Sequence, residues 1–198
     1  MGIEFGYIAG QTPLDPDEID GLRIDSISTR QELDEFEQQN VEEAIFWVMK
    51  HALKTEVILS EAFVCQLHKE MYNTVWSWAG KFRKTQKNIG IDHWQIGSAL
   101  KCLLDDTLYW IKHETYQADE IALRFKHRLV SIHCFPNGNG RHSRLMADTI
   151  VTRIFKQPVF TWGKTNLVQH GDSRAIYLSA VKAADKGNLS PLLDFARS

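Results

Sequence analysis

A twelve-residue stretch from residue 133 to residue 144 gathers the groups that phosphate chemistry requires. It reads HCFPNGNGRHSR. The imidazole of His133, with an ordinary pKa of about 6.5, can accept a proton at neutral pH and is a candidate general base. Gly138 and Gly140 lack a Cβ, so the backbone there can take positive φ and direct several N–H groups at one anion. Together these residues favour a site that holds a phosphate beside a base.

Two arginines, Arg141 and Arg144, follow the glycines. Three residues apart on a helix, they point to roughly one face, and each guanidinium can bridge two phosphate oxygens. A helix that begins near Gly140 would add its N-terminal amides and its dipole to the same point. Taken singly, a glycine turn, a histidine or a helix-surface arginine is usually structural. Their combination within twelve residues favours an anion site.

Helical periodicity on both sides of this stretch predicts the elements that position it. Thr29 and Glu32 have the spacing of a capping box, and Ser60 can cap a later helix. The apolar residues that follow Thr29 recur at helical spacing, which allows a break near Asn40, while acids crowd the opposite side. The expected helices cover about residues 29–54, 60–79, 98–113, 118–132, 140–155 and 173–185, with one more turn at about 190–195.

Two stretches lack this periodicity. Residues 1–25 are rich in glycine, proline and acids and predict an irregular arm. Residues 81–91 place β-compatible side chains around a polar centre and predict a short β-hairpin. The expected fold class is therefore mainly α, a helical bundle that carries one β-hairpin.

Composition narrows the classes of function. With 198 residues and 43% hydrophobic content, the chain can bury a sizeable core. Its formal charge of -2 gives no basic field, so we expect no direct binding of nucleic acid, and no segment has the length of apolar sequence that a membrane requires. Three cysteines without paired spacing fit a reducing compartment. A cytoplasmic protein is expected.

The stretch from residue 133 to residue 144 closely resembles the signature of the Fic/DOC family, H-x-F-x-(D/E)-G-N-G-R-x-x-R. Residues 78–83 with 88–90 resemble the flap of that family, and residues 183–193 resemble its C-terminal helices. The resemblance implies a Fic-type helical bundle with a β-hairpin flap over residues 40–198. Residues 1–39 would be an N-terminal arm and capped helix, a candidate regulatory segment. Within the family the chain most resembles the mobile mystery protein B group.

The resemblance implies an activity, the transfer of AMP from ATP to a hydroxyl side chain of a target protein with release of pyrophosphate. His133 would be the base and Arg141 and Arg144 would neutralise the β- and γ-phosphates. The residues that cradle the α- and β-phosphates would be Gly138, Asn139 and Gly140. Toxin–antitoxin proteins are known in this family, so an antitoxin or other regulatory protein is a candidate partner.

Asn137 departs from the family signature, which most often has an acidic residue there that helps to hold magnesium. An amide oxygen can ligate Mg²⁺ or Mn²⁺ but brings no negative charge. We therefore expect the metal to be held largely by the nucleotide, with Asn137 as a neutral ligand. Catalytic competence depends on this position.

The hairpin is a candidate docking site for the target. An exposed edge strand can pair with an extended peptide, which would lie beside His133. A surface hairpin with solvated lysines is an equally good interpretation of the residues alone. The docking residues would be Lys84, Thr85, Gln86, Lys87 and Asn88.

Fic proteins often carry an inhibitory helix with the motif S/T-x-x-x-E-(G/N), whose glutamate pairs with the second signature arginine. Ser28 and Glu32 match this motif in part, because Leu33 stands where glycine or asparagine is expected. The capping box that Thr29 and Glu32 form is the favoured alternative. Glu37 is a weaker inhibitory candidate.

Other functions remain open at this point. The same cradle and base could transfer another phosphate-containing group or remove AMP. From a different class, the chain could be a nucleotide-binding or interaction module in which Asn137 has weakened or abolished catalysis.

Overall fold

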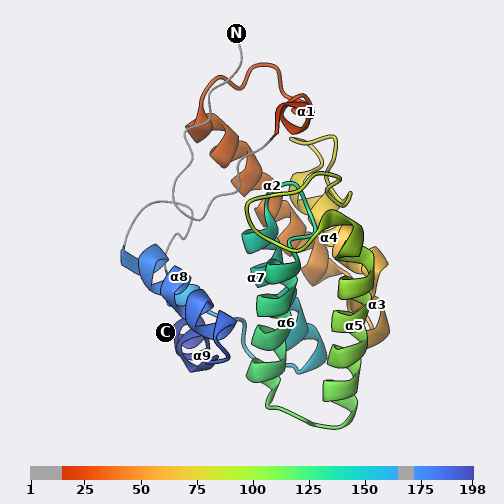
Figure 1. Ribbon diagram of the computed structural model, residues 1–198, viewed down its shortest axis with the longest axis vertical. Coiled ribbons are helices and arrows are strands. Elements are labelled where there is room, and N and C mark those ends of the chain that lie inside the picture. The colour runs from red at the N-terminus through yellow and green to blue at the C-terminus, as the bar shows by residue number, and fades with distance from the viewer. Residues whose placement is uncertain (1–14, 165–171) are drawn as a thin grey trace.

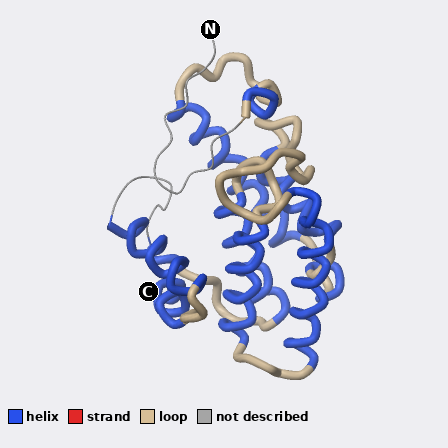
Figure 2. The backbone as a smooth tube through the Cα atoms, in the orientation of Figure 1, coloured by secondary structure: helices blue, strands red, loops and turns tan. Residues whose placement is uncertain are grey.

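The computed structural model describes residues 15–164 and 172–198, and these form a bundle of helices (Figure 1). The mainly α class is confirmed, and the described residues contain no β-strand (Figure 2). None of the helices in these two ranges is long and apolar enough to cross a membrane. The α-helices are α1 (Pro16–Ile19), α2 (Arg30–Lys50), α3 (Thr55–Ile58), α4 (Glu61–Tyr72), α5 (Ile96–Lys112), α6 (Ala118–Ile132), α7 (Asn139–Thr149), α8 (Asp172–Asp185) and α9 (Ser190–Arg197).

The helices on either side of residues 133–144 lie where the periodicity predicts them. α6 has the expected bounds, and α7 continues through a π-helical turn, η2 (Ile150–Ile154), to the predicted end. The Ser60 hydroxyl accepts the Phe63 N–H (3.2 Å), so α4 begins at the predicted cap. α2 does not break near Asn40, because that side chain is buried and accepts a hydrogen bond from the Thr74 hydroxyl (2.8 Å). Asn40 therefore lies in the apolar pattern because it makes a buried polar contact, and it does not mark a helix end.

The core lies between α4, α5, α6 and α7, with α2 packed on α4. Leu67, Phe125, Phe135 and Met146 are fully buried in it. Each such side chain contributes about 1.5–3 kcal/mol by leaving water. α6 and α7 pack against each other and are joined by residues 133–138, which we call the signature loop. The loop therefore sits at one end of a well-buried helix pair.

The predicted β-hairpin is wrong. Residues 81–91, the flap segment, have no strand and form an irregular loop in front of the upper ends of α4 and α7 (Figures 1 and 2). The Arg83 guanidinium donates hydrogen bonds to the carbonyls of Thr85 (2.9 Å) and Ile91. In a hairpin these carbonyls would be available to amides of the opposite strand. The segment closes around a side chain instead.

The N-terminal region is more ordered than the prediction of an irregular arm. Residues 1–14 lie outside the described residues, and α1 follows them with a capping box between Asp15 and Glu18. An isolated antiparallel bridge joins Leu22 to Trp76. The proposed boundary between residues 39 and 40 falls inside α2.

Candidate active site

His133 lies at the C-terminal end of α6, where it takes a left-handed backbone conformation (φ 59°, ψ 61°). For a residue other than glycine this conformation costs about 1–2 kcal/mol. Its carbonyl accepts a hydrogen bond from Arg83 Nε (2.6 Å), and the residue is only 4% exposed. The chain thus turns sharply at His133 and carries the imidazole to the wall of a cleft.

The environment of His133 keeps its imidazole neutral. Burial, followed by the nearby cations Arg83 and Lys87, lowers its pKa to about 4, against an opposing hydrogen bond with the backbone of Val130. A neutral imidazole can accept a proton at neutral pH. The predicted base is in the protonation state that its role requires.

The signature loop is closed by Asn139. Its Oδ1 accepts the Phe135 N–H (2.9 Å) and its Nδ2 donates to the Phe135 carbonyl (2.7 Å). The Phe135 ring is fully buried and stacks on His68, with ring centroids 3.7 Å apart. The side chain of Asn139, which is predicted to bind the phosphates, thus shapes the loop, and its backbone N–H is available for an anion.

Gly138 caps α7 in a left-handed conformation (φ 78°). A Cβ at this position would lie 2.6 Å from the ring of Tyr72, so no other residue fits without displacing that ring. The first hydrogen bond into α7 runs from the His142 N–H to the Gly138 carbonyl (2.9 Å). The three amides before it, at residues 139–141, form the helix N-terminus, which is the arrangement that binds phosphate.

His68 joins Gly80, the residue directly before the flap segment, to the signature loop. Its Nδ1 accepts the Gly80 N–H (3.0 Å) and its Nε2 donates to the Asn137 carbonyl (3.1 Å). Burial lowers its pKa well below the ordinary value, so the ring is neutral with a defined tautomer. The side-chain oxygen of Asn137 accepts the Gly138 N–H (2.6 Å), which leaves its second lone pair for a ligand. No motif in the sequence marks His68 for this role.

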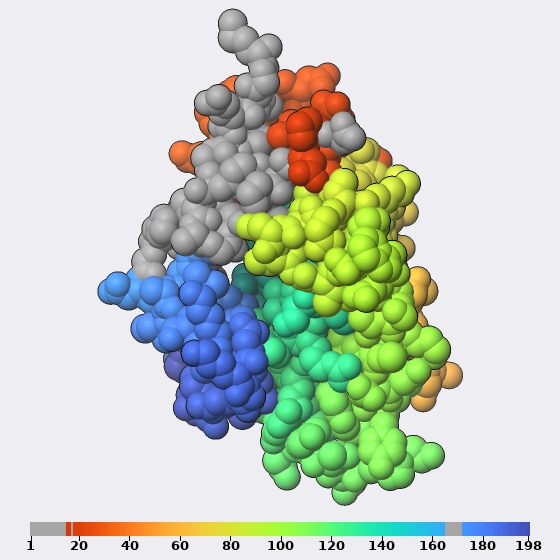
Figure 3. Space-filling model, viewed as in Figure 1, coloured from red at the N-terminus to blue at the C-terminus, as the bar shows by residue number. Residues whose placement is uncertain are grey.

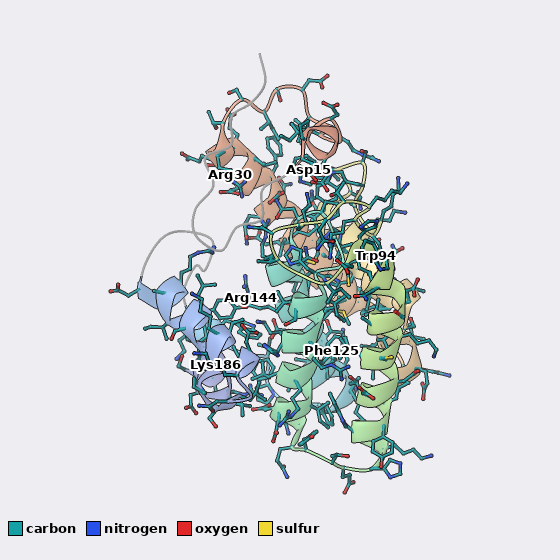
Figure 4. All side chains as sticks on the ribbon, in the orientation of Figure 1. Asp15, Arg30, Trp94, Phe125, Arg144 and Lys186 are labelled. Atoms are coloured by element: carbon teal, nitrogen blue, oxygen red, sulfur yellow. The ribbon has the colours of Figure 1, made fainter. Side chains whose placement is uncertain are left out.

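The two signature arginines are not equivalent. Arg141 is ion-paired with Glu37 of α2, which is 1% exposed, and the other oxygen of Glu37 accepts the Trp76 indole N–H (2.7 Å). Arg144 reaches into the space between α7 and α8 (Figure 4), where its guanidinium lies 5.4 Å from the ring centre of Tyr177. Arg144 is therefore the arginine with the freer charge. Glu37 pairs with the first signature arginine, whereas the inhibitory motif pairs with the second.

A cleft of about 530 Å³ brings most of the predicted residues together. It opens where the surface of α8 meets that of α6 and α7, the blue and green surfaces in Figure 3. Its lining includes the predicted set His133, Asn137, Gly138, Asn139, Gly140, Arg141 and Arg144.

The cleft is also lined by Lys126 and Tyr177, which no motif in the sequence marks. The ammonium of the fully buried Lys126 lies 4.7 Å from the centre of the Tyr177 ring. Burial raises the pKa of Tyr177, but Lys126 and Arg144 lower it by more, to about 8. This wall of the cleft is rich in positive charge.

Residues 58–151 match the Fic/DOC family. This part of the chain is a Fic/DOC domain. The predicted Fic family is thereby confirmed, and the cleft that the signature residues line lies largely within the matched region.

Curated relatives of this Fic/DOC domain carry the name protein adenylyltransferase Fic. The protein from Drosophila grimshawi is 29% identical over 147 residues, which is 72% of this chain and 28% of the relative. The protein from Aedes aegypti is 29% identical over 120 residues, 59% of this chain and 22% of the relative. The chain thus spans about a quarter of the length of these relatives.

Solved structures share the fold. BepC from Bartonella tribocorum, with bound AMPPNP, superposes with a TM-score of 0.66 at 18% identity and covers 86% of this chain and 87% of that one. Fic-1 from C. elegans gives a TM-score of 0.67 at 23% identity and covers 90% of this chain and 51% of that one. At these identities the likeness concerns the Fic fold alone.

Ser28 and Glu32, the candidate inhibitory residues, lie at the start of α2 and not among the residues that line the cleft of the Fic/DOC domain. The Glu32 carboxylate accepts the N–H groups of Ser28 (2.8 Å) and Thr29 (2.9 Å). The same contacts lower its pKa. The Thr29 hydroxyl in turn accepts the Glu32 N–H (3.2 Å), so the capping box is formed as predicted.

The flap segment of the Fic/DOC domain does not present all five candidate docking residues. Lys87 is buried and pairs with Asp15 (2.8 Å) and Glu18 of the N-terminal region, and the Thr85 hydroxyl also bonds Glu18 (3.2 Å). Of the five, the exposed side chains are those of Lys84, Gln86 and Asn88. Lys87 and Thr85 therefore make contacts that hold the segment.

Proposed function

We propose that this protein transfers AMP from ATP to a hydroxyl side chain of a target protein. The observation that carries the proposal is that the neutral His133, the N-terminus of α7 and Arg144 line one cleft. The adenylyltransferase names of the curated relatives and the AMPPNP bound to BepC support it.

In this mechanism the target hydroxyl attacks the α-phosphorus of ATP. A P–O bond forms to the target, the bond to the β-phosphate breaks, and pyrophosphate leaves. His133 accepts the proton of the hydroxyl, which for a well-placed base accelerates the reaction by about 10² to 10⁴. The imidazole can do so because it is neutral at the pH of the reaction.

The backbone N–H groups of residues 139–141 would bind the α- and β-phosphates, because they form the N-terminus of α7. Arg144 would neutralise the terminal phosphate. Arg141, with its charge already paired to Glu37, would mainly hold the start of α7 in place. Most catalysis of such transfers comes from positioning and charge stabilisation of this kind.

The residues present can accommodate a magnesium or manganese ion but cannot hold it alone. The described part of the chain has no group of three or more His, Cys, Asp or Glu arranged for a metal, and Asn137 offers one neutral oxygen. The ion would arrive with the nucleotide, and it would supply charge neutralisation for the phosphates. Asn137→Asp should maintain or raise AMP transfer, measured as label incorporated per minute; lost activity in a folded variant would contradict this role.

The decisive experiment incubates the purified protein with cell lysate, magnesium and ATP labelled at either the α- or the γ-phosphate. Relative to lysate without the protein, in which endogenous kinases transfer the γ-phosphate, we expect added label on protein from α-labelled ATP only. His133→Ala should reduce it by at least about 10². His113→Ala, which alters an exposed histidine at the end of α5, is the matched control and should retain full activity.

Other outcomes identify the alternatives. Protein labelled from γ-labelled ATP indicates transfer of another phosphate-containing group, and loss of AMP from a pre-labelled protein indicates removal of AMP. ATP binding without transfer, in the wild type and in Asn137→Asp alike, indicates a nucleotide-binding module. Any of these would contradict the proposed function.

Finer assignments belong to the same proposal. The subgroup would be mobile mystery protein B, acting in the cytoplasm, with an antitoxin or regulatory protein as a candidate partner and residues 1–39 as a candidate regulatory segment. Lys84, Gln86 and Asn88 would meet the target. For Ser28 and Glu32 the capping role is favoured, so Glu32→Gly should leave autoadenylylation unchanged; a marked increase would show that Glu32 inhibits.

A further inference from the structure

Arg83 is a charged side chain that lies almost entirely inside the protein, at 2% exposure. Its guanidinium donates hydrogen bonds to four backbone carbonyls. Two belong to the end of α6, at His133 (2.6 Å) and Ile132 (3.5 Å). The other two, at Thr85 (2.9 Å) and Ile91, belong to the middle and the end of the flap segment.

The α6 contacts explain how His133 keeps its left-handed turn. The last carbonyls of a helix have no partner within the helix, and a cation is favoured there because of the helix dipole. Arg83 supplies both the hydrogen bonds and the charge at this helix end. The backbone N–H of Arg83 also donates a hydrogen bond to the carbonyl of Cys134 (2.9 Å), the residue that follows His133.

Gly90 completes the contact from the other end of the flap segment. It has positive φ (96°), and a Cβ there would lie 2.5 Å from the Cβ of His133 and 3.1 Å from Arg83 Nη2. The backbone at residue 90 can therefore rest directly on His133 only because it is glycine. Residues 89–91 line the cleft beside the imidazole.

We infer that Arg83 and Gly90 form a clasp that fixes His133 and holds the flap segment over it. Arg83 is a positioning residue, because its guanidinium contacts backbone carbonyls and acts through His133. The Arg83 side chain then fixes the position of the base relative to the segment that is proposed to meet the target. This inference rests on the proposed function only in assigning His133 as the base.

A role of Arg83 confined to the flap segment would leave the proton affinity of His133 unchanged. The charged groups near the imidazole are Arg83 and Lys87, both from the flap segment, with Lys87 paired to Asp15 and Glu18 of the N-terminal region. Of the two cations, Arg83 has the larger effect in lowering the pKa of His133. The clasp therefore has a spectroscopic signature that does not depend on enzyme turnover.

The test titrates His133 by NMR in the histidine-labelled 198-residue protein and follows hydrogen exchange of the amides at residues 84–91. Arg83→Met should raise the pKa of His133 by about one unit, a tenfold change in proton affinity, and speed exchange at least tenfold. Arg83→Lys keeps the charge but cannot reach four carbonyls, so the pKa should stay low while exchange still rises.

Gly90→Ala tests the clasp without altering a charge, and it remains informative should Arg83→Met fail to fold. It should speed exchange of residues 84–91 and lower AMP transfer. Gly97→Ala, at a helical glycine with open space around its Cβ position, is the matched control and should change neither. Unchanged exchange in folded Gly90→Ala and Arg83→Lys, or an unchanged His133 pKa in folded Arg83→Met, would overturn the inference. Because titration and exchange need no target, absence of AMP transfer in the wild type would contradict the proposed function and leave these readouts intact.

Discussion

The signature loop and the flap segment border the same cleft but are held in different ways. The loop is closed by neighbours in sequence, through Asn139 on Phe135 and through Gly138 at the start of α7. The flap segment is closed by Arg83 and is tied by Lys87 to α1, about seventy residues earlier in the chain.

The two segments differ in how far along the chain the residues lie that determine their conformations. The contacts that close the loop, between Asn139 and Phe135, span four residues, so a short motif specifies them, although His68 and Arg83 also bond the loop from far along the chain. The flap segment depends on partners that become neighbours only after the helices pack. A local pattern therefore describes the loop correctly and misdescribes the flap segment.

The largest expected effect comes from breaking the distant tie with Lys87→Met. Removing one partner of a buried ion pair leaves the Glu18 carboxylate uncompensated, so we expect the free energy of unfolding to fall by about 3 kcal/mol. Denaturant unfolding measures this. Lys84→Met, at an exposed lysine of the same segment, should have almost no effect; equal effects from the two variants would show that the tie is not what holds the flap segment.

Asn139→Ala breaks the local closure instead. It leaves the Phe135 N–H and carbonyl without their buried partner, at a cost of about 2 kcal/mol in the free energy of unfolding, and should weaken ATP binding because the loop loses its shape. Calorimetry measures both quantities. Asn88→Ala, at an exposed asparagine, is the control. Normal ATP affinity in Asn139→Ala would mean that the loop keeps its shape without this side chain.

A smaller expected effect is the change in the free energy of unfolding with pH, which depends on buried histidines in the signature loop and α7. Burial lowers the pKa values of His133 and His142 from 6.5 to about 4, so between these values the unfolded chain binds protons that the folded protein does not, and stability falls as the pH falls. Asp148 acts in the opposite direction, because burial raises its pKa to about 7.

With His68, whose pKa burial also lowers, these histidines outweigh the one carboxyl group, and we expect a net loss of at least roughly 2 kcal/mol on going from pH 6.5 to pH 4. Urea unfolding at the two pH values measures it. Asp148→Asn removes the opposing contribution and should steepen the loss. Stability that is constant or rises toward pH 4 would contradict this account.

Much of the fold could be predicted from the sequence, because apolar periodicity and caps such as Ser60 and Thr29 specify helices locally. The gathering of His133 with the start of α7 was also predictable, since one short motif contains both. The flap segment was not, because Arg83 bonds carbonyls that a hairpin would use for its own ladder.

The unequal roles of the signature arginines could not be predicted either. Arg141 and Arg144 look alike in the sequence, and their difference comes from Glu37 and Tyr177, which lie on other helices. His68 became a link between two segments only through packing. In each of these cases the deciding partner is far away along the chain.

The buried Lys126 has a consequence for finding ligands. Burial lowers the pKa of this ammonium group, which lies against a tyrosine ring rather than a carboxylate, so an anion bound in the cleft would favour its charged form. An anion that binds there associates with the native state and not with the unfolded chain, and by mass action it raises the melting temperature as its concentration exceeds the dissociation constant. A thermal-shift screen of nucleotides and polyphosphates would therefore report occupancy of the cleft before any target protein is known.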